Sequence, residues 1–455
     1  MSPAPRTRFR CEPPGSLVVS AGAVVLREHG DEGPRWVLAQ GERVVALLDE
    51  GLTPAEISKL GDLREQARIH ALLSGLAALG RLDLDFAWRG RELATLRRVT
   101  PALVLTIASP PAEAVVLSRL SHLRSEQHGE ERTAILEHAL SPCRVVLHAP
   151  ELGALLVTLA APTEPRRLSS AAPWASAFVG LLLAAGFVVA AGSEESDPAL
   201  LPWEFHDALM HGRQLRTRPE ERGGTYRLRA RLPSPPMLRA PSGGATVALA
   251  KPPLENTGPG IFTVLERRRS LRAYGADDPE VDRLAALLFH AARLVSVREG
   301  PEGPLAQRPF PSPGARHSLE VYVGVGRCRG LASGFYRYDL AAHGLEHIEG
   351  AKIERLLALA TLASEPPPLL LLLTARFARA SWKYETNAHA LLLQEVGVLL
   401  QTMHMVACAL DLASCMVDRN VGPWFAQTTG ESVLVESPVG ALAVGTLPRS
   451  ERATP

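Results

Sequence analysis

The sequence predicts an α+β protein in which two winged-helix-like units precede one C-terminal α/β sandwich domain. Three observations lead to this prediction. The chain has 455 residues, which is about three times the length of a typical domain. Clusters of Pro and Gly divide it into segments, and strand-like and helical apolar patterns alternate within each segment. We therefore expect a first unit at 1–97, a second at 98–232, a connector at 233–260 and the C-terminal domain at 261–455.

The composition is that of a folded protein without a strong overall charge. Apolar residues make up 46% of the chain and charged residues 21%, which argues against disorder. Lys and Arg number 49 against 48 Asp and Glu, so a net charge of +1 creates no overall field for nucleic acid or an anionic membrane. The five cysteines show no C-x-x-C spacing, which argues against a disulfide framework and a metal site.

Two apolar features bear on where the protein is found. No apolar run follows the basic residues near the N-terminus, so they do not form a secretory signal, and we predict a cytoplasmic protein. Residues 175–192 carry no charge and approach the length of a membrane span. Three glycines divide this stretch, and we interpret it as a buried helix followed by a strand, with no membrane span.

The first unit has the element order that is typical of a winged helix. Alternating apolar runs predict strands, and helical patterns follow them, with a capping box from Thr53 to Glu56. The expected strands are at 17–26 and 35–40. The helical pattern covers 44–51, a second helix starts at 53–56, and 67–84 contains a longer helix and the closing strand. The candidate recognition helix, 65–79, carries little basic charge and few side chains that read bases. We therefore predict that this unit binds a peptide and not DNA.

The second unit repeats this order loosely. We expect a strand at 102–109, a helix at 111–123, strands at 143–149 and 153–160, and a last short helix at 203–216. The following residues, 233–260, are rich in Pro, Gly and Ser, which is typical of an extended connector.

The C-terminal domain opens on an arginine-rich segment, ERRRSLRAYG. If this segment is helical, Arg268 and Arg272 lie one turn apart, with Ser270 near the edge of the same face. Two guanidiniums and a hydroxyl would then grip one anion, for which a phosphate is the natural candidate. The alternative is a basic stretch that faces water.

Two further segments of this domain carry polar side chains beside buried elements. A Pro/Ser/Gly loop in 309–325 leads directly into an alternating strand, so its backbone is open to a planar ligand. Residues 377–409 join a polar, aromatic turn to a long apolar helix, which we expect at the centre of the domain or at a subunit interface. On this helix, Glu395 is expected to be buried and to have a hydrogen-bonding role.

These motifs, in this order, resemble the nitroreductase-like flavoproteins, and specifically the SagB-type dehydrogenases that oxidise azolines to azoles in peptide natural products. ERRRSLRAYG is similar to the family's R-x-S-x-R motif, PSPGARHSLEVYV to its P-S-x-G-A segment, and WKY to its Lys-Tyr pair. The long helix is similar to the one with E-x-G-x-x-x-Q, and WEFHDALMHGR to a motif that precedes the catalytic domain. The resemblance covers roughly residues 200–450 and implies a nitroreductase-like α/β sandwich.

The resemblance implies FMN bound at a homodimer interface. It implies a flavin phosphate and ribityl site at Arg268, Ser270 and Arg272, and flavin-ring contacts at Ser312, Gly314 and Ala315, with Gln401 behind the central helix near the flavin. Lys383 and Tyr384 match the catalytic pair, in which a lysine takes a proton from a weakly acidic carbon and a tyrosine relays or orients it. The implied activity is oxidation of thiazolines or oxazolines in a leader-bearing precursor peptide, with dioxygen as electron acceptor and a cyclodehydratase as a partner.

Some positions depart from the family pattern and leave two alternatives open. Arg316, His317 and Ser318 replace the usual Tyr-Pro, and residues 411–418 lack the usual glycines. One alternative is a flavoenzyme of this fold that acts on another substrate. The other is an inactive scaffold or binding subunit of a peptide-modifying complex.

Overall fold

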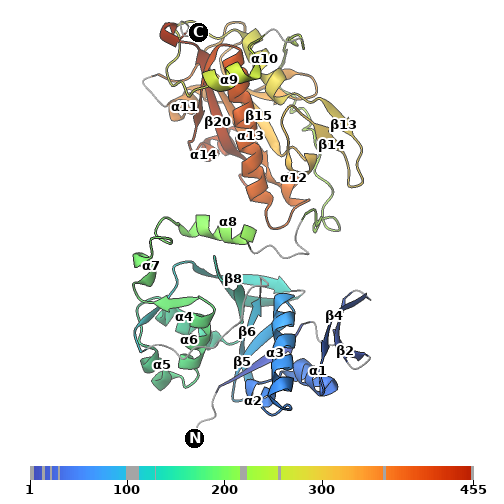
Figure 1. The fold of residues 1–455 in the computed structure, drawn as a ribbon. Coiled ribbons are helices and arrows are strands. Elements are labelled where there is room, and N and C mark those ends of the chain that lie inside the picture. Colours follow the sequence, from blue (N-terminus) through green and yellow to red (C-terminus); the bar gives the residue numbers. More distant parts are fainter. Residues whose placement is uncertain are drawn as a thin grey trace. The chain divides into compact units, whose positions relative to one another are not determined.

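The computed structural model describes residues 5–12, 16–20, 23–28, 31–98, 112–128, 130–215, 223–254, 258–361 and 365–451. The chain forms two compact units, Met1–Pro219 and Glu220–Pro455 (Figure 1). The strand expected at 102–109 lies outside the described residues.

A small three-stranded sheet and three helices open the first unit. The strands pair in the order β2-β3-β4, and Thr53 and Glu56 form the predicted capping box, with the Glu56 amide donating to the Thr53 hydroxyl at 3.2 Å. These elements are β2 (Leu17–Ser20), β3 (Ala23–Glu28), β4 (Asp31–Val37), α1 (Gly41–Glu50), α2 (Pro54–Ile57) and α3 (Leu63–Ala78). The predicted order of strands before helices is present, although the run at 17–26, expected as one strand, contains β2 and part of β3. The elements share one buried apolar core.

A six-stranded antiparallel sheet forms the rest of the first unit. Its strand order is β1-β5-β6-β10-β9-β8, so it takes strands from both of the predicted N-terminal segments. The strands are β1 (Arg6–Cys11), β5 (Leu82–Trp88), β6 (Arg91–Arg98), β8 (Ser121–His128), β9 (Glu131–His138) and β10 (Cys143–Leu147). Three helices pack in a shared core with one face of it: α4 (Pro150–Thr158), α5 (Pro165–Ala171) and α6 (Ala175–Ala184). The remaining elements are β7 (Val115–Leu117), β11 (Val188–Ala190), α7 (Ser193–Ser196) and α8 (Phe205–Leu215).

Two of the predicted elements of this unit are wrong. The described part of the helix expected at 111–123 contains β7 and the start of β8, because Val115–Leu117 pairs with β11 far along the chain. The strand expected at 153–160 is helix α4, in which Pro150 occupies the first turn and fixes a helical start. A short apolar run does not by itself distinguish strand from helix. The helix-then-strand interpretation of 175–192 is confirmed by α6 and β11.

The second unit is a three-layer α/β sandwich, which confirms the predicted fold class (Figure 1). Its seven strands pair antiparallel in the order β12-β17-β16-β15-β18-β20-β19. They are β12 (Thr246–Ala248), β15 (Leu319–Val325), β16 (Gly334–Asp339), β17 (Gly344–Ile348), β18 (Leu369–Arg376), β19 (Leu412–Val417) and β20 (Glu436–Thr446). Strand β18 reads LLLLLTAR because both of its faces are covered.

Helices cover both faces of this sheet. On one face, α10 (Val281–Ala292) and α13 (Ala388–Ala409) pack in the larger core, and on the other, α11 (Ile353–Leu359) and α14 (Gly422–Thr429) pack in a second core. Helix α13 is central, as predicted. It is long and apolar enough to cross a membrane by length and composition alone, but Leu392, Leu399 and Met403 lie in the domain core.

Shorter elements complete the unit. They are α9 (Ile261–Arg267), the β13–β14 pair (Ser296–Arg298 and Leu305–Gln307), a 3-10 turn at Pro313–Ala315, α12 (Phe377–Ser381) and a last 3-10 turn at Arg449–Glu451. The segment expected to be a connector, 233–260, supplies β12, which pairs with β17 at the edge of the sheet. The part of this segment that contains β12 therefore packs with the domain.

Candidate active site

Lys383 and Tyr384 follow the short helix α12, and the fold brings both to the predicted flavin loop. Their amides both donate to the Ala380 carbonyl, at 3.1 and 2.9 Å, so the backbone continues the turn of α12. At Gly314, an added methyl group would lie 2.5 Å from Lys383 Nζ and 2.7 Å from the Tyr384 hydroxyl oxygen. A side chain at this position would force the ends of Lys383 and Tyr384 to move, and Gly314 also has a φ of +60°, which favours glycine. Three of the predicted site residues therefore meet at one point.

Two aromatic rings lie beside the half-buried Lys383 side chain. Its Nζ lies 5.5 Å from the ring centroid of Tyr384 and 5.8 Å from that of Tyr226. Both distances fall within the range of cation–π attraction. Trp382 is buried, and its ring is 5.3 Å from that of Tyr226 in an edge-to-face arrangement. The sequence motifs did not reveal Tyr226.

Glu395, on α13, is a buried carboxyl beside the same loop. It is 2% exposed, and burial raises its pKa to about 7, although the Ser312 hydroxyl and the Ser318 amide favour its ionised form. The Ser318 amide donates to Oε2 at 3.4 Å. The predicted burial of Glu395 is confirmed by its 2% exposure, and a pKa of about 7 lets this carboxyl hold a proton near neutral pH.

His317 lies next to this carboxyl and stays neutral. Burial first, and then the positive charge of Arg308, lowers the pKa of His317 to about 3. Its amide donates to the Ser312 hydroxyl at 2.9 Å, and its Nδ1 lies 3.9 Å from Glu395 Oε1, which is too far for a hydrogen bond. Within the described residues, neither of these two atoms has a hydrogen-bond partner. His317, which stands where the sequence departs from the family motif, is thus a buried residue of the site.

A buried ion pair contacts the backbone of the flavin loop at His317. Arg379 of α12, 1% exposed, donates to Glu320 of β15 at 2.7 Å and to the His317 carbonyl at 3.0 Å. A buried charge needs such partners. Removing either residue would leave its partner charged and unpaired beneath the loop. No sequence pattern reveals this pair, because Arg379 follows β18 and Glu320 lies in β15, 59 residues earlier.

The arginine-rich segment is not helical where a helix was predicted. Helix α9 ends at Arg267, and Arg268 has extended torsion angles, φ −60° and ψ 119°. No helix face therefore brings Arg268, Ser270 and Arg272 together. The segment is instead held along the edge strand β19, where the Leu271 amide donates to the Ser414 carbonyl at 2.9 Å.

Two arginines of this segment are paired and two are not. Arg267 donates to Asp411 at 2.7 Å, and Arg269 pairs with Glu451. Among the described residues, Arg268 and Arg272 form no ion pair, so their charges are available to an anion. A cavity of about 290 Å³ adjoins the segment, but Arg268, Ser270 and Arg272 do not line it, and its lining includes the carboxylates of Glu266 and Glu451. The charges of Arg268 and Arg272, and not this cavity, are therefore what suits a phosphate.

The other predicted residues lie near the Lys383, Tyr384 and Gly314 contact or near the arginine-rich segment. Ser312 and Ala315 flank Gly314, and Ala315 also has a positive φ of 54°. Gln401 is half-buried on α13, one turn before His404, whose Nε2 is 3.1 Å from the Arg269 carbonyl. Glu395 and His404 are nine residues apart on α13, which corresponds to about 13.5 Å along the helix. Helix α13 therefore runs from the loop beside Lys383 to the arginine-rich segment.

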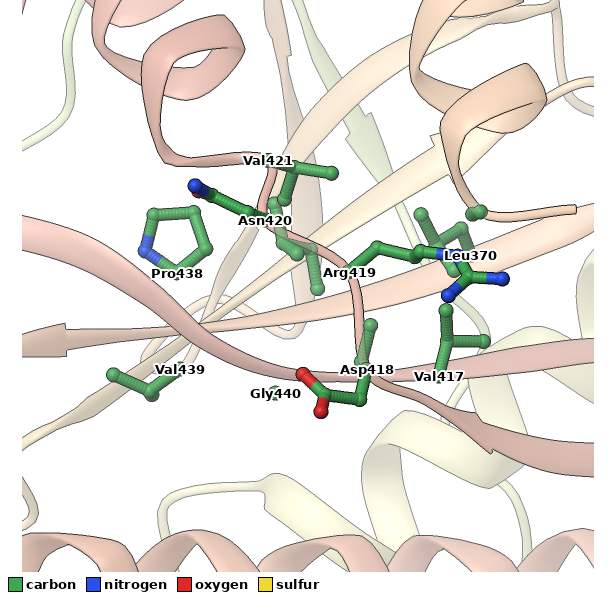
Figure 2. A pocket seen from close by; sticks show the side chains of 12 residues that line it. Leu370, Val417, Asp418, Arg419, Asn420, Val421, Pro438, Val439 and Gly440 are labelled. Atoms are coloured by element: carbon green, nitrogen blue, oxygen red, sulfur yellow. The ribbon is translucent and has the colours of Figure 1, made fainter. Parts of the chain in front are cut away.

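The segment without the expected glycines has a regular structure. Residues Leu412–Val417 form β19, in which other residues serve as well as glycine. The loop after it, Asp418–Asn420, lines a second cavity of about 290 Å³ together with Pro438 to Gly440 of β20 (Figure 2).

Comparisons with known proteins agree with this geometry. Residues 265–446 match the Nitroreductase family. This part of the chain is a nitroreductase-family domain. The match confirms the predicted resemblance to nitroreductase-like flavoproteins. Residues 115–220 match the family described as cyanobactin oxidase ThcOx. Together the two matches support an oxidoreductase.

Individual relatives of the nitroreductase domain are distant. A protein of Methanocaldococcus jannaschii, described as a nitroreductase, is 28% identical over 177 residues, covering 38% of this chain and 85% of that protein. A nitroreductase structure from Ralstonia eutropha matches at a TM-score of 0.37 and 20% identity, covering 47% of this chain and 95% of that one. The E. coli microcin synthetase McbBCD, solved with truncated pro-MccB17, matches at 0.33 and 20%, covering 44% and 77%.

Proposed function

We propose that the protein is an FMN-dependent azoline dehydrogenase that oxidises thiazoline or oxazoline rings to thiazole or oxazole in a ribosomally made precursor peptide. The observation that carries this proposal is the meeting of Lys383, Tyr384 and Gly314 within a nitroreductase-family domain. The cyanobactin-oxidase match at 115–220 supports a peptide substrate. Dioxygen is the proposed electron acceptor and is reduced to hydrogen peroxide.

The residues present fit FMN. Arg268 and Arg272, which have no ion-pair partners among the described residues, would hold its phosphate together with Ser270. The loop from Ser312 to Ala315 would lie against its ring, because Gly314 leaves the backbone open there. When bound, FMN supplies an acceptor for the hydride that leaves the azoline ring.

The chain's own residues would handle the proton that leaves the neighbouring ring carbon. Lys383, beside two aromatic rings and close to Gly314, is the proposed base, with Tyr384 orienting its amine or relaying the proton. Glu395 lies buried against Ser312 and Ser318 of the same loop and gains or loses a proton near neutral pH. Holding these groups in place before the substrate arrives is the main contribution of the protein to such a reaction.

The N-terminal unit is the proposed peptide-binding part. In the sheet β2-β3-β4, the two outer strands β2 and β4 present edges, and a leader peptide would add there as a further strand. Main-chain hydrogen bonds would give the affinity, which suits a unit whose helices carry little basic charge. We further propose a cytoplasmic homodimer, in which the exposed Leu393 and Val398 of α13 contribute to the interface, and an association with a cyclodehydratase.

The first test is the visible spectrum of the purified protein, together with the mass of any cofactor released on denaturation. Stoichiometric FMN supports the flavin site, and a protein that stays colourless when titrated with FMN refutes it. The second test is Lys383→Ala, with Lys352→Ala, an exposed lysine of the same domain, as control. Azoline peptides should lose two hydrogens per ring with the control but not with Lys383→Ala. If Lys383→Ala retains turnover of another flavin substrate, the enzyme acts on something else, and if no variant turns over, the scaffold alternative holds.

A further inference from the structure

A strap of residues 223–244 crosses the surface beside Lys383 and lies outside both matched segments, 115–220 and 265–446. Side chains of the nitroreductase domain hold its carbonyls. Trp382 Nε1 donates to the Leu232 carbonyl at 3.1 Å, and Arg379 Nε donates to that of Pro236 at 3.0 Å. The strap is therefore tied to the two side chains that flank and support the candidate site.

Ion pairs fix the far end of the strap. Arg239 donates to Glu436 at 2.6 Å, to Glu431 at 2.7 Å and to the Tyr322 hydroxyl at 2.7 Å. Glu346 accepts from the Ser242 hydroxyl at 2.8 Å and from the Gly243 amide at 3.0 Å. Charge-assisted hydrogen bonds of this kind define one geometry closely. The strap is thus part of the domain and not a loose connection.

At its start, the strap places Tyr226 against Lys383 in a strained conformation. Tyr226 has a φ of +50°, which is unusual for a residue with a side chain. Its amide donates to the Lys383 carbonyl at 3.2 Å, and its ring lies edge-to-face with Trp382 and 5.8 Å from Lys383 Nζ. Strain of this kind persists only where surrounding contacts maintain it, and it concentrates at functional sites.

Gly224 also lies close to the Lys383 side chain. An added methyl group there would lie 3.1 Å from Lys383 Cε and 2.9 Å from the Tyr226 ring. Gly314 approaches the same side chain from the flavin loop, 2.5 Å from Nζ by the same measure. The Lys383 side chain therefore runs between two glycines and along two aromatic rings.

We propose that Tyr226 is a positioning residue for Lys383, and that the strap completes the active site. The assignment of Lys383 as a base rests on the proposed function, but the positioning rests on contacts alone. A lysine side chain has many rotamers, and the ring of Tyr226 with Gly224 leaves it few of them. A base that is already held in its reactive position acts more efficiently than one that must first reach that position.

The test compares the acetylation rate of Lys383 by a water-soluble acylating reagent, measured by peptide mass spectrometry, in the wild type and in variants. Tyr226→Ala should raise the rate about three- to tenfold, because it releases the side chain. Tyr226→Phe keeps the ring and should match the wild type. The control Arg227→Ala changes an exposed neighbour of the same strap and should also match. An unchanged rate in Tyr226→Ala, or a raised rate in Arg227→Ala, overturns the proposal.

Two further measurements separate positioning from a loss of folding and from failure of the proposed function. Gly224→Ala, which adds a methyl group against Lys383 and keeps Tyr226, should also change the acetylation rate. An unchanged rate contradicts the proposal that Gly224 and Tyr226 restrict the Lys383 side chain. With an azoline peptide, Tyr226→Ala should lower kcat and leave KM unchanged, while Tyr226→Phe restores kcat. If no azoline is oxidised by the wild type, the proposed function fails, and the acetylation result still decides the role of Tyr226.

Discussion

Replacing Glu395 by Gln should make the stability of the protein less sensitive to pH. Burial raises the pKa of Glu395 from 4.5 to about 7 in the folded protein, so the folded state binds its proton more tightly than the unfolded state does. Stability that depends on this proton is fully present below about pH 4.5 and is lost as the pH rises through about 7.

The magnitude follows from the difference between the two pKa values. That difference is about 2.5 pH units, and at about 1.4 kcal/mol for each pH unit it corresponds to about 3 to 4 kcal/mol between about pH 4.5 and pH 8.5. The wild type should lose this free energy of unfolding over that range, and Glu395→Gln should not, because an amide carries no charge at either pH. Relative to the wild type, the variant therefore gains about 3 to 4 kcal/mol as the pH rises.

The assay is urea unfolding of the purified wild type and variant at several pH values, taking the difference between them at each pH. This difference removes the contributions of other titrating groups that the two proteins share. Glu354→Gln, on the exposed face of α11, is the matched control and should follow the wild type at every pH. A constant difference between wild type and Glu395→Gln across the range would refute the reasoning, since the carboxyl would then titrate normally.

Two other substitutions test contacts of the same domain. Gly314→Ala places a methyl group 2.5 Å from Lys383 Nζ and should lower kcat by about a hundredfold through misplacement of the lysine. Gly430→Ala has a similar φ of +72° but no atom within 4 Å of the added group, so steady-state assays should show near-normal activity. Arg239→Met should cost about 2 kcal/mol in urea unfolding, because it removes charged hydrogen bonds to the fully buried Glu436, which keeps its pair with Arg376 at 2.7 Å. Arg327→Ala breaks an exposed pair and should cost about 0.5 kcal/mol or less, and equal losses in the two variants would contradict the view that burial sets the cost.

Much of the local structure follows from short stretches of sequence. The capping box at Thr53, the helix-then-strand at 175–192 and the central apolar helix α13 are all present as predicted. Each depends on spacing or on caps within one element, which act over a few residues. Where the run was short and apolar, as in α4, the same reasoning chose the wrong element.

The arginine segment shows a second kind of limit. Arg268 and Arg272 were placed on a helix face, but α9 ends at Arg267 and the chain follows β19. The hydrogen bond from Leu271 to Ser414 lies between segments far apart in sequence, and no local pattern reveals it. The residues themselves still fit an anion site, and only the geometry that presents them differs.

By itself, the sequence determined the order of motifs, the class of the C-terminal domain and the chemistry of its candidate residues. These depend on residue types and on short spacings, which the chain carries whether folded or not. Only the tertiary structure decided that Gly314, Lys383 and Tyr226 meet, that Glu395 is buried enough to titrate near 7, and that the strap belongs to the site. Contacts between distant segments and the loss of water around a charge arise only when the chain packs, because both depend on what every other part of the fold covers.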